Sequence, residues 1–406
     1  MSEWQLGKGG FELNRDPDTR ALLDFPSEVF IVDSTIRSLQ SSVSGSRHAA
    51  DDLVEIGLAL DRLGVRELLI NLSWADGLEV VEKLASARPN ARIVGTFRAS
   101  LERAPEYLEA GIATGVDEIC IESAPSVTFL EHAAERLREA GKDISHAFAE
   151  ALSWDELVEL STAAVRCGSR SLSFHDSYFR MGVNPEAMKV FIRRVRTAVP
   201  HHPPLYVHLS NFYGQATMTG VAAVTAGASA IDVCLNLTGH HCGHISLAEA
   251  VMVLEDLYDI RTGIDLERIS ETLDVVKTRS GVPIRLQQPV IGEYAFMVDG
   301  TDRAAEAHLR YDDRMHSLLP FPPRVVGAEE RVIWTHRTAR SDTIALRLAS
   351  LGLPSDQKSA QRALQLLQGA VEGKKEYPAW LTDDEFVRLL ESQSVPREGS
   401  YESVHK

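Results

Sequence analysis

Residues 205–210 read Leu-Tyr-Val-His-Leu-Ser, a short run in which apolar and polar side chains alternate. Successive side chains of a strand point to opposite faces, so the apolar set shares one face while His208 and Ser210 share the other. Residues 169–175 repeat this pattern and place His175 on the polar face. If the apolar faces pack against helices, these polar side chains point inward at the C-terminal ends of strands. Barrel enzymes carry out their chemistry at that end.

Eight β-rich runs of this kind lie between residues 28 and 260. They are Val29–Ser34, Glu67–Asn71, Ala91–Thr96, Glu118–Glu122, Ile144–Phe148, Ser169–His175, Leu205–Ser210 and Ala230–Asn236. Amphipathic stretches separate them, for example residues 49–63, 154–167 and 185–199. The alternation predicts the α/β class and a closed parallel (β/α)8 TIM barrel, with a doubly wound open sheet as the alternative.

The barrel pattern stops after Ile260, and residues 282–335 are rich in proline with little periodicity. Residues 341–392 are helical in pattern again. We therefore expect an N-terminal segment (1–27), a catalytic barrel (28–280), a small linker subdomain (281–340) and a C-terminal helical subdomain with a tail (341–406).

Composition narrows the class of protein. Of the 406 residues, 44% are hydrophobic and 25% are charged, which is typical of a globular chain. The formal charge of −16 argues against nucleic acid or an anionic membrane as a partner. The four cysteines show no C-x-x-C spacing, and no segment has the apolar length of a signal peptide or a membrane span. We expect a soluble cytoplasmic protein that acts on a small molecule.

Three segments carry a family resemblance: residues 33–38 (Asp-Ser-Thr-Ile-Arg-Ser), 208–216 (His-Leu-Ser-Asn-Phe-Tyr-Gly-Gln-Ala) and 239–244 (Gly-His-His-Cys-Gly-His). Together they resemble the metal-dependent (DRE-TIM) barrel superfamily. Its members include isopropylmalate and homocitrate synthases, hydroxymethylglutaryl-CoA lyase and the carboxyltransferase domain of pyruvate carboxylase. Residues 289–296 (Pro-Val-Ile-Gly-Glu-Tyr-Ala-Phe) resemble the start of the synthases' linker subdomain. The resemblance covers about residues 28–390 and favours the synthase branch.

The resemblance implies roles for three residues. Arg37 matches the family arginine that stabilises an enolate oxygen, and Glu150 matches an active-site glutamate of the synthases. Asp33 would either support the arginine loop or take part in the chemistry directly. We therefore expect Arg37, Glu150 and Asp33 to be the catalytic residues.

Several family positions are changed in this chain. Ser38 stands where the family has a metal-binding aspartate, Ser210 where it has the second histidine of His-x-His, and His244 where it has an asparagine. Val298 and Asp302 stand near the places of the synthases' linker histidines. Hydroxyls are weak metal ligands, so the family's metal site cannot be copied unchanged.

A re-formed metal site is the hypothesis that follows. His175, His208 and His244 would meet at the ends of three adjacent strands, and three neutral imidazoles with an open position suit zinc or another divalent transition metal. Asp176 or a loop carboxylate would orient one ring. The alternative for each histidine is an ordinary packed or helix-capping side chain.

We predict that five residues around the barrel mouth contact the substrate: Ser38, Arg98, Ser210, Asn211 and Tyr213. The resemblance implies an enzyme that joins an acyl-CoA enolate to a 2-oxo acid. Two alternatives stay open, namely an aldolase, lyase or other carbonyl-acting enzyme without CoA, and a binding or regulatory barrel without catalysis. The resemblance also implies a homodimer.

Overall fold

The structure is a computed structural model that describes residues 11–26, 28–41, 48–74, 76–100, 102–299, 319–329, 331–335, 339–372 and 380–392. The chain divides into two compact units. The first holds the described residues up to Gly292 together with Val325–Gly327, and the second holds the other described residues. Within the described ranges, no helix is both long and apolar enough to cross a lipid bilayer.

Eight parallel strands of the first unit close into a barrel, in which each strand pairs with the next and β8 pairs with β1. The strands are β1 (Phe30–Asp33), β2 (Glu67–Asn71), β3 (Arg92–Arg98), β4 (Glu118–Glu122), β5 (Asp143–Phe148), β6 (Leu172–His175), β7 (Leu205–His208) and β8 (Ala230–Val233). Each strand overlaps its predicted range, and the predicted (β/α)8 barrel is confirmed. Strands β7 and β8 end earlier than predicted because the residues after them turn into loops at the barrel mouth.

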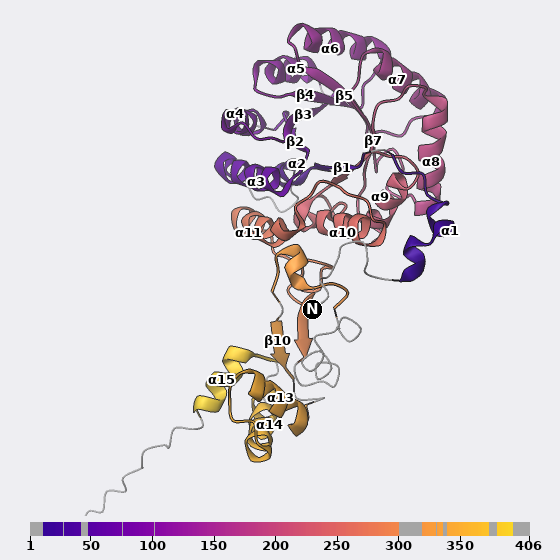
Figure 1. The fold of residues 1–406 in the computed structure, drawn as a ribbon. Helices are drawn as coiled ribbons and strands as arrows, with labels where there is room; N and C mark the ends of the chain where they lie inside the picture. The colour runs from indigo at the N-terminus through magenta and orange to yellow at the C-terminus, as the bar shows by residue number, and fades with distance from the viewer. Residues whose placement is uncertain are drawn as a thin grey trace, which may run out of the picture. The chain divides into compact units, whose positions relative to one another are not determined.

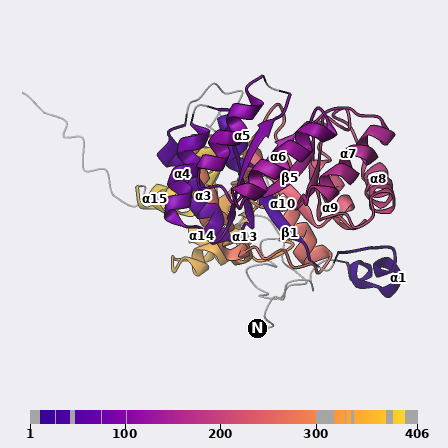
Figure 2. The ribbon, with the colours of Figure 1, turned by 90° about the horizontal axis from the view of Figure 1, so that it is seen from above.

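Helices cover the outside of the barrel, as Figures 1 and 2 show. They are α2 (Thr35–Gln40), α3 (Ala50–Leu63), α4 (Gly77–Ala87), α5 (Ala104–Ala113), α6 (Val127–Glu139), α7 (Trp154–Arg166), α8 (Pro185–Ala198), α9 (Ala216–Val224), α10 (Leu247–Met252) and α11 (Ile269–Ser280), with the short α1 (Pro17–Arg20) before the first strand. A single π-helical turn, Val253–Leu257, continues α10. Asn184 caps helix α8, because its side chain accepts a hydrogen bond from the Ala187 amide, and Pro185 is favourable as the first residue of the helix.

The structure confirms the prediction that the polar side chains of β6 and β7 point into the barrel and that their apolar side chains point toward the helices. Ser173, His175 and Tyr206 line the barrel interior, where apolar side chains such as those of Val32 and Val94 are also buried. On the other face of β6, Phe174 is fully buried and packs edge-on against Phe191 of α8, with ring centroids 4.9 Å apart. Alternation along β6 and β7 therefore sends the polar set inward and the apolar set under the helices, whereas β1 and β3 also direct apolar side chains into the interior.

Charged and polar side chains tie the strands together at the N-terminal end of the barrel. Arg92 and Arg170 both pair with the buried carboxylate of Glu118, at 3.4 Å and 3.3 Å. The Tyr206 hydroxyl donates to Glu67 at 3.2 Å. These contacts connect β2, β3, β4, β7 and the residues just before β6, so they stabilise the barrel at the end opposite to the histidines.

The second unit contains a three-stranded sheet in the order β11-β10-β9. Its elements are β9 (Met297–Asp299), β10 (Arg331–Trp334), β11 (Leu381–Thr382), α13 (Ser341–Ser350), α14 (Gln357–Glu372) and α15 (Asp383–Ser392). Trp334 is fully buried and stacks on Phe386 with ring centroids 4.0 Å apart. The helices agree with the predicted helical stretch 341–392, whereas the sheet was not predicted.

Candidate active site

Three histidine rings gather at the C-terminal end of the barrel strands. His175 ends β6 and His208 ends β7, and the two residues are register partners. His244 follows β8 and pairs through its backbone with Ser210. The ring centroids of His175 and His208 are 4.9 Å apart, and those of His208 and His244 are 4.3 Å apart. All three side chains are buried. We call this group the histidine cluster.

The central ring of the cluster is held by a carboxylate from the neighbouring strand. His208 Nδ1 lies 2.9 Å from Asp232 Oδ2, and the other oxygen of Asp232 accepts a hydrogen bond from Ser34 Oγ at 2.5 Å. The sequence reasoning missed Asp232. The available signal was that it is the one charged residue in the apolar run Ala230–Leu235.

The third ring is surrounded by small side chains. Ser38 Oγ lies 3.3 Å from His244 Nδ1 and 3.2 Å from Cys234 Sγ. Gly239, with φ of 129°, passes so close that an added Cβ would lie 2.2 Å from His244 Nδ1. No other residue type fits there without moving the ring, which explains the glycine at that point of the loop.

Burial determines the protonation state of His175 and His244, the two rings on either side of His208 in the histidine cluster. It lowers the pKa of His175 and of His244 well below the usual value, and the nearby His208 ring and the Arg37 guanidinium lower it further. Both outer rings are therefore neutral near pH 7. Burial also raises the pKa of the Cys234 thiol well above its usual value, helped by the charges of Asp33 and Asp232. The thiol is accordingly a poor nucleophile and a poor base.

A buried ion pair brings Arg37 into the site. Arg37 Nη2 lies 2.8 Å from Glu122 Oε1, and the two side chains are 14% and 3% exposed. Burial lowers the pKa of Arg37, but the charges of Glu122 and Asp232 outweigh it, so the pKa is raised overall and the guanidinium stays charged. Arg98 Nε lies 3.9 Å from the other oxygen of Glu122, and its side chain is 55% exposed. Glu122 was not predicted, although its place at the end of β4 was a signal.

Asp33 supports the loop that carries Arg37. Its two oxygens accept hydrogen bonds from the backbone amide of Thr35 at 2.7 Å and from the Thr35 hydroxyl at 3.0 Å. Burial raises the pKa of Asp33 to about 7, and the charge of Asp232 adds to this rise. These contacts agree with the supporting role that we considered for Asp33, and its part in any chemistry stays a prediction.

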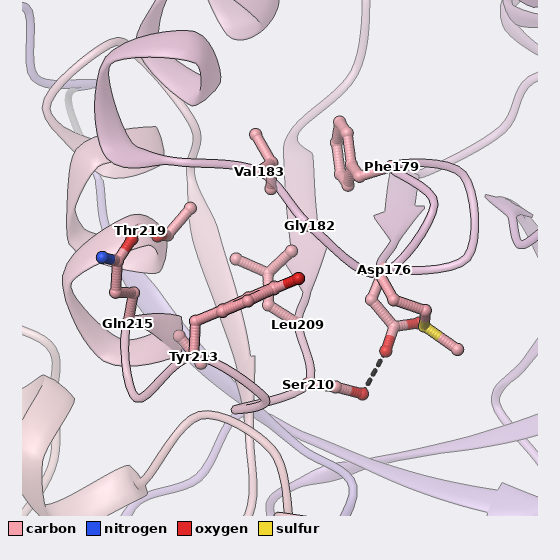
Figure 3. A pocket seen from close by; sticks show the side chains of 11 residues that line it. Asp176, Phe179, Gly182, Val183, Leu209, Ser210, Tyr213, Gln215 and Thr219 are labelled. Atoms are coloured by element: carbon pink, nitrogen blue, oxygen red, sulfur yellow. Dashed lines mark hydrogen bonds between the residues drawn. The ribbon is translucent and has the colours of Figure 1, made fainter.

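Three other predicted residues lie in the loop after β7. Ser210 donates a hydrogen bond to Asp176, the residue that we expected to orient a histidine ring. Asn211 Oδ1 accepts from the Ala216 amide at 3.1 Å and so shapes the loop before α9. Tyr213 is 78% exposed. Figure 3 shows this region as a pocket whose lining includes Leu209, Tyr213 and the hydrogen-bonded pair of Ser210 and Asp176.

Glu150 does not belong to the buried histidine cluster. It lies two residues beyond the end of β5 and is exposed to solvent. Among the described residues it forms no hydrogen bond or ion pair with the cluster. Glu150 thus lies at the same end of the barrel without a direct contact to Arg37 or His208 among the described residues, and its catalytic role stays a prediction. Asp302 and the side chain of Val298 lie outside the described part of the chain.

A family model describes most of the barrel. The HMGL-like model matches residues 28–276, which is more than half of the chain. The chain belongs to the HMGL-like family. The match begins just before β1 and ends within α11, so it includes every strand that contributes to the histidine cluster.

Curated relatives of this HMGL-like chain include homocitrate and 2-isopropylmalate synthases. A homocitrate synthase of Methanopyrus kandleri is 25% identical over 372 residues, which cover 85% of this chain and 88% of the relative. A 2-isopropylmalate synthase of Caldanaerobacter subterraneus is 26% identical over 327 residues, covering 75% of this chain and 81% of the relative.

Solved structures of HMG-CoA lyases share the fold of this HMGL-like chain. The Bacillus subtilis enzyme superposes with a TM-score of 0.56 at 16% identity, covering 65% of this chain and 98% of the lyase. The lyase of Acinetobacter baumannii, solved with coenzyme A and 3-methylmalate, gives 0.52 at 18% identity over 64% of this chain and 93% of the lyase. At such identities these likenesses concern the fold alone.

The resemblance implies a divalent metal ion, so the side chains of this HMGL-like chain should include a group that can bind one. The described residues include no group of three or more His, Cys, Asp and Glu side chains arranged to hold a metal ion. The hydroxyls of Ser38 and Ser210 already have partners within the protein. The Nδ1 atom of His208 lies against Asp232, which leaves Nε2 as the atom of this ring that could bind a metal. Binding of a metal by His175, His208 and His244 stays a prediction.

Proposed function

We propose that this chain is a divergent synthase-like enzyme that forms a C–C bond between the enolate of an acyl-CoA and the carbonyl carbon of a 2-oxo acid. The observation that carries the proposal is the buried, charged Arg37 beside the histidine cluster at the barrel mouth. A preorganised cation in a dry site stabilises negative charge that develops on oxygen, as an enolate requires. Similarity to homocitrate and isopropylmalate synthases over 75–85% of the chain supports the same reaction class.

The residues around the mouth suit the two substrates. Arg98 is partly exposed and offers a cation to the carboxylate of the 2-oxo acid. Ser38, Ser210, Asn211 and Tyr213 supply hydroxyl and amide groups near the reacting atoms, and these groups would orient the substrates.

Incubation with acetyl-CoA and a panel of 2-oxo acids, with free thiol measured, tests the proposal. We expect thiol release that depends on the 2-oxo acid and falls about 10²–10³-fold in Arg37→Lys. Arg166→Lys, on the exposed surface of α7, is the matched control and should keep full activity. Cleavage of hydroxy-oxo acids without CoA would favour the lyase or aldolase alternative. No turnover with any substrate would favour a binding barrel.

Metal binding, a homodimer and a cytoplasmic location stay predictions. Metal analysis of protein expressed with added metal tests the first, and less than about a tenth of an equivalent would count against it. Light scattering tests the second, and a monomer at micromolar concentration would remove it. Fractionation of cells tests the third.

A further inference from the structure

Glu122 is the described side chain that fixes the guanidinium of Arg37. Arg37 Nη2 donates a hydrogen bond to Glu122 Oε1 at 2.8 Å, and the two side chains are 14% and 3% exposed. Among the described residues, Nε of Arg37 has no hydrogen-bond partner. One buried carboxylate therefore sets the direction in which this guanidinium points.

The backbone around Glu122 is held on both sides. The Glu122 carbonyl accepts a hydrogen bond from the Ala99 amide at 2.8 Å. The next amide, that of Ser123, donates to the Ala147 carbonyl at 2.9 Å. Ser123 has a φ of 55°, a left-handed conformation that a residue with a side chain keeps where its surroundings impose it. The Glu122 carboxylate thus extends from a rigid strand end, where Glu122 is the register partner of Arg98.

The second oxygen of Glu122 lies near another cation. Arg98 Nε is 3.9 Å from Glu122 Oε2, which is beyond hydrogen-bonding distance, and the Arg98 side chain is 55% exposed. Both arginines lie near the histidine cluster: the pKa of His175 is lowered by burial, by the His208 ring and then by the charges of the two guanidinium groups. Glu122 therefore borders one fixed and one loosely held cation at the same site.

A fixed cation and a mobile cation suit different charges of the condensation. The enolate oxygen develops its charge during the reaction, and a cation already in place stabilises this charge without reorganisation. The carboxylate of the 2-oxo acid arrives charged, and an exposed guanidinium can bind it on arrival. Arg37 meets the first requirement and Arg98 meets the second.

We infer that Glu122 is a positioning residue that assigns the two arginines to these separate tasks; this inference rests on the proposed function. Glu122 fixes Arg37 beside the cluster through a hydrogen bond, and it attracts Arg98 by charge alone. Its negative charge also weakens the attraction of Arg98 for an incoming carboxylate. The residue that supports the enolate step thereby limits the affinity for the 2-oxo acid.

A double-mutant cycle with Glu122→Gln and Arg37→Lys tests the positioning of Arg37. We expect Glu122→Gln to lower kcat about 10–10²-fold, since a displacement of about 1 Å has a cost on that scale. In the Arg37→Lys background it should lower kcat by less than about twofold. Glu109→Gln, at an exposed ion pair with Arg136, is the matched control and should keep the wild-type kcat. Equal losses in both backgrounds would show that Glu122 acts independently of Arg37 and overturn the inference.

Binding of the 2-oxo acid gives a readout that a merely structural role would not produce. Calorimetry with pyruvate, 2-oxoisovalerate and 2-oxoglutarate should show a Kd about two- to fivefold lower in Glu122→Gln for any acid that binds, because loss of the negative charge frees Arg98. Local loss of structure would instead raise Kd. An unchanged or raised Kd, or no binding of any of the three acids to the wild type, overturns the inference.

Glu122→Asp keeps the charge on a side chain that is one methylene shorter. We expect it to lower kcat, because the hydrogen bond to Arg37 is lost, and to leave Kd unchanged. A wild-type kcat in this variant counts against the inference. Urea unfolding gives the folded fraction of every variant, and Glu122→Asp replaces Glu122→Gln in the cycle if the latter does not fold.

The two proposals fail in distinguishable ways. Absence of thiol release from the wild type, with acetyl-CoA and each of the three acids, defeats the proposed function. The Kd values still decide in that case whether Glu122 restrains Arg98. Thiol release by the wild type together with additive losses in the cycle leaves the proposed function standing and overturns the inference.

Discussion

Replacing Gly239 by alanine perturbs the histidine cluster through a single methyl group. The new Cβ would lie 2.2 Å from Nδ1 and 2.3 Å from Cε1 of His244. Ordinary contact begins near 3.4 Å, so the ring must retreat by about 1 Å, a displacement that can cost about 100-fold in rate when a catalytic group is involved. The backbone at φ of 129° is also unfavourable for alanine.

The cost in stability has two parts. A strained left-handed backbone costs about 1–3 kcal/mol, and forcing a methyl group into a filled site costs about 1–3 kcal/mol more. Gly239→Ala should therefore lower the free energy of unfolding by about 2–6 kcal/mol. The matched control is Gly141→Ala, where φ is 66° but nothing lies within 4 Å of the added Cβ. It carries the backbone cost alone, about 1–2 kcal/mol.

Urea unfolding and the thiol-release assay measure both effects. We expect Gly239→Ala to lose more stability than Gly141→Ala, and to lose activity about 100-fold while the control keeps it. Equal losses of stability in the two variants, with the turnover of Gly239→Ala within about twofold of the wild type, would refute the reasoning that His244 must occupy this place.

Three further changes test the packing of both units. Glu122→Gln removes the negative charge that lies 2.8 Å from Arg37 and should cost about 3 kcal/mol in urea unfolding. Burial lowers the pKa of His146 from 6.5 to about 4, so the unfolded chain binds a proton that the folded chain does not, and stability falls as pH falls through this window. His146→Phe should remove this loss, at most about 3 kcal/mol, when unfolding is compared at pH 7 and pH 4.5. Asp383→Asn weakens the 2.7 Å hydrogen bond from Trp334 Nε1 and should destabilise the second unit by about 1–3 kcal/mol, followed by tryptophan fluorescence.

Controls exist for these changes. Glu139→Gln, at an exposed ion pair with Arg136, should cost less than about 1 kcal/mol, and an equally small loss for Glu122→Gln would contradict a stabilising buried pair. An acid dependence of stability that persists in His146→Phe would show that other groups cause it. An unchanged fluorescence transition in Asp383→Asn would show that this carboxylate does not hold the second unit.

The barrel could be predicted because its signals are local. Each strand is a short β-rich run, and alternation within residues 169–175 and 205–210 fixed which side chains face inward. The approach of the three histidines follows from the same logic, since strand ends of a parallel barrel meet at one mouth. What these residues do chemically does not follow from their placement.

The partners of the site residues could not be predicted. His208 meets Asp232 and Arg37 meets Glu122, and in both cases the partners lie on different elements. The sequence left Asp176 or a loop carboxylate as the group that orients a histidine ring, but the Asp176 carboxylate binds Ser210 and Asp232 of β8 meets His208. Neighbours in sequence on a strand end point in opposite directions, so contacts with other elements, such as that between His208 on β7 and Asp232 on the adjacent β8, decide which acid meets which base.

The sheet of the second unit was missed for a different reason. It joins three short segments that are far apart in the sequence, and β11 has only two residues, Leu381–Thr382. Runs this short carry no measurable periodicity, and their pairing depends on a buried cluster around Trp334. The helices of the same unit have a period that extends over several turns and were therefore predictable.

Hydrogen exchange at the methyl group of acetyl-CoA tests the enolate at the centre of this account. In deuterium oxide, with a 2-oxo acid or its hydroxy analogue present, mass spectrometry should detect deuterium in the methyl group of acetyl-CoA after incubation with wild-type protein, and much less after incubation with Arg37→Lys. Wild-type protein that leaves the methyl group unlabelled, or an Arg37→Lys variant that labels it as fast as the wild type does, would contradict the account.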